Sequence, residues 1–143
     1  MKILDILQQK SDDVETLRIG QSVGVAMKIL IDKGVGAVVV CNSNGGVVGI
    51  LSERDIIRII TRKGPAAVGQ EVSEAMTSKV ISCSPDNTVK EVMAVMTQKR
   101  FRHMPVISNG KLIGVISIGD VVKSQLTDRD LEVNVVRDFL QAS

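Results

Sequence analysis

The chain has 143 residues, of which 44% are hydrophobic and 24% charged, and its net charge is +2 at pH 7. This length allows one sizeable core, or two small halves that share one. The small net charge and the presence of only two aromatic residues, both Phe, argue against a protein that binds single-stranded nucleic acid by base stacking.

In chain order, the first half predicts a helix after the capping residue Ser22, with apolar side chains at helical spacing. A β-hairpin over 36–51 follows, because Asn and Gly separate two β-rich runs. A helix over 55–60 closes the unit. Residues 64–69, rich in Gly, Ala and Pro, are interpreted as a linker.

The second half repeats this plan. An entry strand over 80–84 precedes a helix that begins after Thr88, where Glu91 completes a capping box. A second hairpin covers 103–116, and a closing helix starts near Asp120. We therefore interpret the chain as a duplicated strand-helix-strand-strand-helix unit.

The phrase Gly-x-x-Ser-x-x-Asp occurs once in each half, over 49–55 and 114–120. Each copy predicts a strand that runs into a helix N-terminus, where unpaired N–H groups favour an anion. The structural alternative is a capping box between Ser and Asp, and for an isolated copy it is the stronger interpretation. Duplication does not separate the two, since it copies a cap as well as a site.

The predicted fold class is α+β. The first unit with its lead-in covers 1–68, the second unit covers 69–127, and an amphipathic helix is expected over 128–143. Units of this size bury little apolar surface alone, so the two should pack against each other.

The chain resembles a stand-alone CBS domain pair, the module named after cystathionine β-synthase. The resemblance is carried by the repeated phrase together with 74–77, 84–89 and 102–106, in the expected order and spacing. It implies two units packed sheet to sheet with pseudo-twofold symmetry, leaving two clefts. It also implies a non-enzymatic regulatory module that binds an adenosine-containing ligand such as AMP, ATP, NAD or S-adenosylmethionine, and a homodimer that forms a disc of four units.

Within this resemblance we favour the second-unit cleft as the ligand site. Asp120 would bind the ribose hydroxyls, Ser117 and the basic cluster at Arg102 and His103 the phosphate, and the entry strand the adenine edge. Met104 or Val106 is expected to pack against adenine while the other packs inward. The predicted residues of this site are Ile81, Ser82, Cys83, Arg102, His103, Met104, Pro105, Ser117 and Asp120.

The first-unit site is expected to be weaker, because Ala37 and Val38 stand where the second unit has His103 and Met104. Its predicted residues are Thr16, Arg18, Ala37, Val38, Ser52, Arg54 and Asp55. Arg54, Arg58 and Arg62 recur four residues apart and are interpreted as a solvated helix face, with phosphate binding across a dimer interface as the alternative.

The remaining features favour a cytoplasmic protein that needs no cofactor. The two cysteines lack metal or redox spacing, and we expect buried reduced thiols. The start of the chain lacks a secretory pattern, and no apolar run is long enough to span a membrane. No catalytic set can be assembled, so the chain is not expected to be an enzyme. The alternative function is a ligand-free dimerisation or adaptor module that binds a partner protein.

Overall fold

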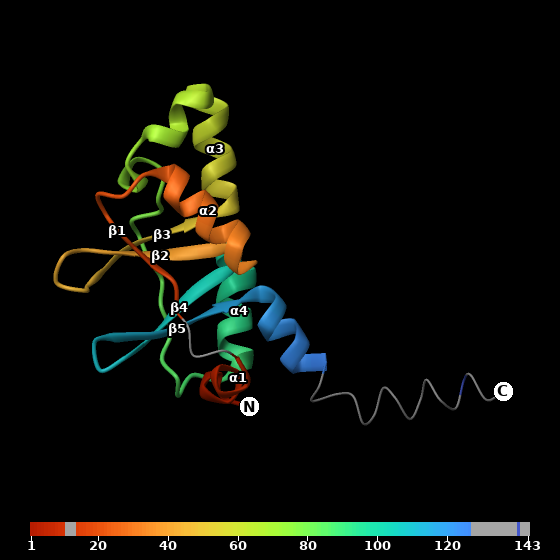
Figure 1. Cartoon of the computed structure of the whole chain (residues 1–143). Coiled ribbons are helices and arrows are strands. Elements are labelled where there is room, and N and C mark those ends of the chain that lie inside the picture. Colours follow the sequence, from red (N-terminus) through yellow and green to blue (C-terminus); the bar gives the residue numbers. More distant parts are fainter. Residues whose placement is uncertain (11–13, 127–139, 141–143) are drawn as a thin grey trace.

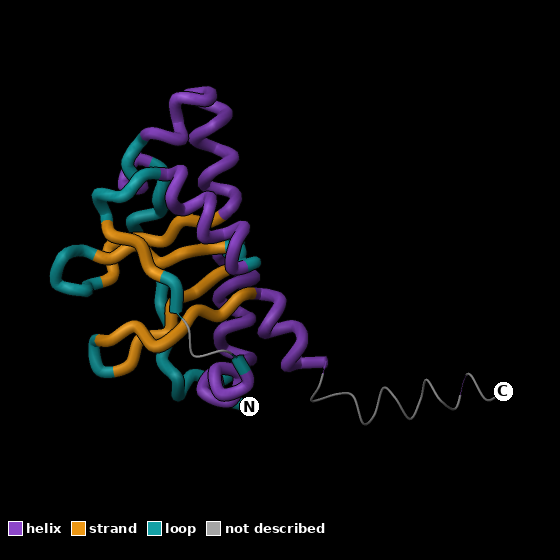
Figure 2. Tube along the Cα trace, in the orientation of Figure 1, coloured by secondary structure: helices purple, strands orange, loops and turns teal. Residues whose placement is uncertain are grey.

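The computed structural model describes residues 1–10, 14–126 and 140. The helix expected over 128–143 lies outside this part of the chain, apart from residue 140. Figure 1 shows the two units one above the other, and Figure 2 shows their strands grouped together with helices toward the outside. The α+β class and the duplicated unit are both confirmed.

The first unit is a three-stranded sheet with helices packed on it. β1 (Thr16–Arg18) pairs in parallel with β2 (Ala37–Cys41), which pairs antiparallel with β3 (Val47–Ser52). α2 (Val23–Lys33) begins after Ser22, whose hydroxyl accepts from the Val25 N–H as predicted. α3 (Glu53–Lys63) follows β3 directly and has a large apolar face, including buried Ile56 and Ile59.

The second unit repeats this arrangement. α4 (Val89–Lys99) begins after Thr88, and the predicted capping box with Glu91 is present. β4 (His103–Ser108) pairs antiparallel with β5 (Lys111–Ser117). A helix begins at residue 118 and is described to residue 126. The expected entry strand over 80–84 is reduced to a single parallel bridge from Cys83 to Val106, in the position that β1 occupies in the first unit.

The segment predicted as a linker is instead folded onto the first unit. η1 (Gly64–Gly69) is a 3₁₀ helix that packs against α2 and α3. Its Ala67 is fully buried in the first core. Pro and Gly correctly indicated the end of α3, but the small side chains between them allow close packing rather than an exposed connection.

The lead-ins of the two units are exchanged. α1 (Ile3–Gln9) packs through Ile3 and Ile6 into the core of the second unit, whereas Val72 of η2 (Val72–Glu74) lies in the core of the first. Backbone hydrogen bonds tie Val72 to Gln21 and Ile3 to Asn87, just before α2 and α4 respectively. The first core therefore includes Val72 from beyond residue 68, and the second core includes Ile3 and Ile6 from the start of the chain.

The glycine of each repeated phrase makes room for this exchange. A Cβ on Gly49 in β3 would collide with the Met76 side chain, and a Cβ on Gly114 in β5 would collide with Leu7. Met76 comes from the lead-in of the second unit and Leu7 from that of the first. Each lead-in is thus brought beside the Ser-x-x-Asp segment of the other unit, which decides which side chains lie against Asp55 and Asp120.

Candidate ligand-binding site

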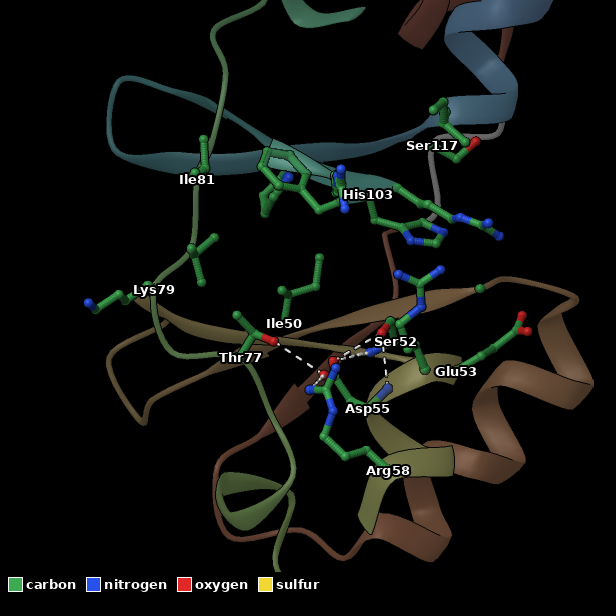
Figure 3. Close-up of a pocket in the computed structure, with 18 of the residues that line it drawn as sticks. Ile50, Ser52, Glu53, Asp55, Arg58, Thr77, Lys79, Ile81, His103 and Ser117 are labelled. Atoms are coloured by element: carbon green, nitrogen blue, oxygen red, sulfur yellow. Dashed lines mark hydrogen bonds and ion pairs between the residues drawn. The ribbon is translucent and has the colours of Figure 1, made fainter. Parts of the chain in front are cut away.

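A cavity of about 680 Å³ lies between the two units. It is bounded by the end of β3 and the start of α3, by the lead-in over 77–81, by β4, and by the start of the helix at 118. In Figure 3, Ser52 and Asp55 lie on one side, His103 and Ser117 on the other, and Thr77, Lys79 and Ile81 along the connecting chain. A volume of this size is typical of small-molecule sites. The lining residues are Gly36, Ile50, Ser52, Glu53, Arg54, Asp55, Ile57, Arg58, Thr77, Lys79, Val80, Ile81, Arg100, Phe101, Arg102, His103, Pro105, Ser117, Ile118 and Gly119.

Asp55 is the buried carboxylate of the cavity, with 5% of its surface exposed. Ser52 donates to Oδ2 from its backbone N–H at 2.9 Å and from its hydroxyl at 3.0 Å. Thr77 and Arg58 both donate to Oδ1 at 3.3 Å. The four donors match the acceptor capacity of a carboxylate, so each oxygen is already satisfied by the protein itself. A ligand hydroxyl must therefore replace Thr77 or Arg58 at Oδ1.

Basic side chains predominate around this carboxylate. Five cationic residues line the cavity, against the two carboxylates of Glu53 and Asp55. The five are Arg54, Arg58, Lys79, Arg100 and Arg102. Arg58 forms an ion pair with Asp55 while 61% of its side chain stays exposed. An excess of guanidinium groups in a concave site favours an anionic ligand, phosphate above all, because each offers several donors in one plane.

His103 begins β4 and pairs in register with Ser117 at the end of β5. Gly36 provides space for it, since a Cβ there would lie 2.8 Å from Nε2 of the imidazole. Burial lowers the pKa of His103, although Glu53 and Asp120 oppose the shift; Lys10 and Arg102 lower the pKa further. Burial therefore favours the neutral imidazole, and both Glu53 of one unit and Asp120 of the other are close enough to act on its pKa.

The second Ser-x-x-Asp segment is engaged differently. Asp120 accepts from the Ser117 N–H at 2.9 Å and from the Lys10 ammonium at 2.7 Å. Burial alone would raise the pKa of Asp120, but the hydrogen bonds from Lys10 and Ser117 outweigh it and the pKa is lowered. Lys10 also donates to the Val115 carbonyl at 2.9 Å. Asp120 does not line the cavity.

The cavity is lined by residues from both of the predicted sites. The predicted residues that line it are Ile81, Arg102, His103, Pro105, Ser117, Ser52, Arg54 and Asp55. Among the Ser-x-x-Asp carboxylates, Asp55 and not Asp120 lines the cavity together with Arg102 and His103, whereas the predicted second-unit site pairs these two residues with Asp120. The cause is the exchange of lead-ins, which carries residues 77–81 to the β3 edge of the first unit, where Thr77 bridges Ile50.

The other predicted residues lie elsewhere. Ser82 is exposed, and Cys83 is buried in the second core. Thr16 and Arg18 lie on β1 with exposed side chains, and Ala37 and Val38 are buried in β2. None of these six lines the cavity.

Which residues of β4 face the cavity follows from the alternation of side chains between the two faces of a strand. Met104 and Val106 both pack into the second core, because residues two apart in a strand point to the same face. The expectation that one of them packs inward and the other against adenine is therefore wrong. Pro105, on the opposite face, lines the cavity.

Sequence reasoning also missed residues that the cavity contains. Arg58 was interpreted as part of a solvated face, yet its guanidinium bonds to the buried carboxylate of Asp55. Thr77, Lys79 and Glu53 were not selected at all. For Arg58 a signal was available, since it lies three residues after Asp55 on the same helix and side chains at that spacing meet.

The described part of the chain contains no group of three or more His, Cys, Asp or Glu residues placed to hold a metal ion. In residues 1–10, 14–126 and 140, no helix has the length and apolar character needed to span a membrane.

Comparison with known proteins agrees with this architecture. Residues 5–62 and 72–127 each match the CBS domain family, and the chain belongs to that family. The CBS-domain protein ATU1752 of Agrobacterium tumefaciens has a crystal structure that is 44% identical, with a TM-score of 0.83 over 87% of this chain and 92% of that one. CBSX3, a mitochondrial CBS-domain protein of Arabidopsis thaliana, is 34% identical over 81% of this chain. This chain spans 58% of the length of CBSX3.

More distant structures share the fold. CBSX2, solved in complex with AMP, is 22% identical with a TM-score of 0.77 over 88% of this chain and 97% of that one. The CBS domain pair of MJ0100, solved with 5′-methylthioadenosine and S-adenosyl-L-methionine, is 23% identical with a TM-score of 0.80 over 90% of this chain and 98% of that one.

Proposed function

We propose that this chain is a non-enzymatic regulatory module that binds an adenine nucleotide in the cavity between its two units. The observation that carries the proposal is the position of Asp55, a buried carboxylate set among five cationic side chains. The complexes of CBSX2 and of MJ0100 with adenosine-containing ligands support this class of ligand, since both share the fold.

The lining divides into parts that suit the parts of a nucleotide. Ile50, Ile81 and Pro105 offer apolar surface on which a base packs. The Asp55 carboxylate accepts from vicinal ribose hydroxyls once it releases Thr77 and Arg58. The released Arg58 then joins the other cationic groups as a phosphate ligand, so binding of ribose and of phosphate is coupled through one carboxylate.

The charge of the cavity favours a phosphorylated ligand over a phosphate-free or cationic adenosyl compound. We expect ATP and AMP to bind more tightly than 5′-methylthioadenosine or S-adenosylmethionine, because only the phosphates use the cationic side chains. The affinity for ATP should fall with added salt more steeply than that for AMP, since ATP carries more charge.

Titration calorimetry of the full chain with these four ligands tests the proposal. Saturation at about a hundred times the dissociation constant should raise the free energy of unfolding by about 2.7 kcal/mol, which a thermal melt detects independently. Absence of both heat and a melting shift with all four ligands would refute nucleotide binding and favour the adaptor function.

A homodimer is the proposed assembly. Ile57 of α3 is 66% exposed, and Val122, at the same place in the repeated unit, is 45% exposed. Exposed aliphatic side chains at equivalent positions of two helices suit an interface with a second copy. Ile57→Glu should shift the sedimentation coefficient to that of a monomer, whereas Ile31→Glu on α2, where Ile31 is 81% exposed, serves as the control.

A further inference from the structure

Arg100 ends α4 in a backbone conformation that is unusual for a residue with a side chain. Its φ is 60° and its ψ is 38°, which is the left-handed region. Gly34 ends α2 in the same conformation, with a φ of 65° and a ψ of 36°. Arg100 precedes His103, the first residue of β4, as Gly34 precedes Ala37, the first residue of β2. The two positions are therefore equivalent in the repeat, and only the second unit has a side chain there.

This side chain has a cost in backbone strain. Glycine adopts the left-handed region freely, whereas a Cβ is crowded by the neighbouring carbonyl oxygen in it. The other described residues at positive φ are glycines and Asn109, and asparagine tolerates this region. Arg100 thus stands where local backbone preference favours glycine. Strain of this kind beside a ligand cavity indicates a use for the side chain.

The position of the Arg100 side chain shows what that use is. Arg100 lines the cavity between the units, and Gly34 does not. Arg100 is also exposed, so it lies at the mouth of the cavity. Among the described residues its guanidinium has no hydrogen-bond or ion-pair partner, so contacts within this part of the protein do not offset the strain. Its planar donors are available to an anion.

We propose that Arg100 is a specificity-determining residue of the cavity, which binds the terminal phosphates of a nucleoside triphosphate and so favours ATP over AMP. This inference rests on the proposed function, because it concerns a ligand of the same cavity. The strained arginine then lowers the stability of the free protein and raises its affinity for one ligand, a trade-off that is common at functional sites.

The depth of the ribose carboxylate explains why the terminal phosphates are the ones concerned. Asp55 belongs to the first unit, is 5% exposed, and has Arg58 bound to it. A phosphate chain that starts from a ribose at Asp55 therefore runs outward, past Arg58, toward the mouth. A single phosphate stays beside the ribose, whereas a triphosphate extends to Arg100 of the second unit.

The test is calorimetry of the full chain with ATP and with AMP, on the wild type, Arg100→Gln and Lys99→Gln. Arg100→Gln should weaken ATP binding about 10-fold and AMP binding less than about twofold, because only ATP loses a charge-assisted hydrogen bond. Lys99→Gln is the matched control. It removes one charge from the adjacent residue, which is exposed and does not line the cavity. The ratio of the two affinities should stay within about twofold of the wild-type value in this control.

Urea unfolding tests the strain and verifies that the variants fold. Arg100→Gly should unfold at a higher urea concentration than Arg100→Gln, because both lack the charge and only glycine relieves the backbone. Its ATP affinity should be as low as that of Arg100→Gln. Equal unfolding midpoints for the two variants would overturn the argument from strain.

The binding data separate the two ways in which the proposal can fail. Equal losses of ATP and AMP affinity in Arg100→Gln, or no loss of either, would overturn the role of Arg100 and leave nucleotide binding in place. A wild type that binds neither nucleotide would refute the proposed function, and the role of Arg100 with it.

Discussion

The Thr77 hydroxyl donates to Oδ1 of Asp55 at 3.3 Å, and the two residues belong to different units of the repeat. The bond exists because the lead-in of the second unit crosses to the β3 edge of the first, where Thr77 also exchanges backbone hydrogen bonds with Ile50. The same residue therefore joins the two units in two ways, through its backbone at Ile50 and through its hydroxyl at Asp55. Replacement of the Thr77 hydroxyl by a ribose hydroxyl would remove the second of these contacts and leave the backbone bonds in place.

Asp55→Asn should weaken ATP binding by about 10- to 100-fold, because a hydrogen bond to a charged group contributes about 1.5–3 kcal/mol. Asparagine keeps the shape of the side chain but places an NH₂ donor where ribose hydroxyls need an acceptor. Calorimetry measures the change. Asp32→Asn, on the exposed side of α2, is the control and should leave affinity unchanged. Equal affinity in Asp55→Asn would show that the carboxylate does not contact the ligand.

His103 predicts a pH dependence of stability. Burial lowers its pKa below the ordinary 6.5, so as pH falls below about 6.5 the unfolded chain takes up a proton before the folded chain does. The free energy of unfolding should therefore fall as pH falls from about 6.5 to the lower folded pKa. Urea unfolding at pH 7.5 and 5.5 measures the loss, and His103→Gln should reduce it. If His103→Gln lost as much stability between pH 7.5 and 5.5 as the wild type does, the pH dependence would come from other titratable groups.

Nucleotide binding should reverse this shift. A phosphate beside His103 raises the pKa of the imidazole, so binding takes up protons at pH values between the free and bound pKa. Affinity should then rise as pH falls through that interval. Calorimetry at pH 6 in buffers of different ionisation enthalpy detects the uptake, which should be absent from His103→Gln.

Alanine at the two repeated glycines should destabilise the fold unequally. At Gly49 a new Cβ meets the Met76 side chain and lies 3.1 Å from the Thr77 carbonyl, whereas at Gly114 the close atoms all belong to the flexible end of Leu7. Gly49→Ala should cost about 1–3 kcal/mol, as overpacking does, and Gly114→Ala less. Urea unfolding ranks them against Gly69→Ala, where the site has open space. If Gly49→Ala and Gly69→Ala lowered the free energy of unfolding equally, the close approach of Met76 and Thr77 to Gly49 would be contradicted.

The two thiols should react in a fixed order. Burial raises the pKa of Cys83 to about 11, so at pH 8 about one molecule in a thousand carries the thiolate. Cys41 is only partly buried. Iodoacetamide at pH 8 should therefore modify Cys41 first and Cys83 only when the chain unfolds, as peptide mass spectrometry can follow. Early modification of Cys83 would show that its core opens readily.

The sequence by itself determined the repeated unit and the start of each long helix. Ser22 and Thr88 cap α2 and α4 because a hydroxyl at that position accepts from an N–H three residues on, a relation contained in local sequence. The hairpins follow from Asn and Gly between β-rich runs, and Asn109 and Gly110 do adopt positive φ. Asp55 and His103 were selected from motifs, which are also local patterns.

Only the tertiary structure decided which carboxylate shares a cavity with the basic cluster. The Ser-x-x-Asp segments have the same local form, and nothing in them says which lead-in will lie beside each. That choice follows from burial of Ile3 and Ile6 in one core and of Val72 in the other, contacts between residues far apart in the chain. Long-range packing of apolar side chains thus placed a neutral Thr77 beside Asp55 and a charged Lys10 beside Asp120.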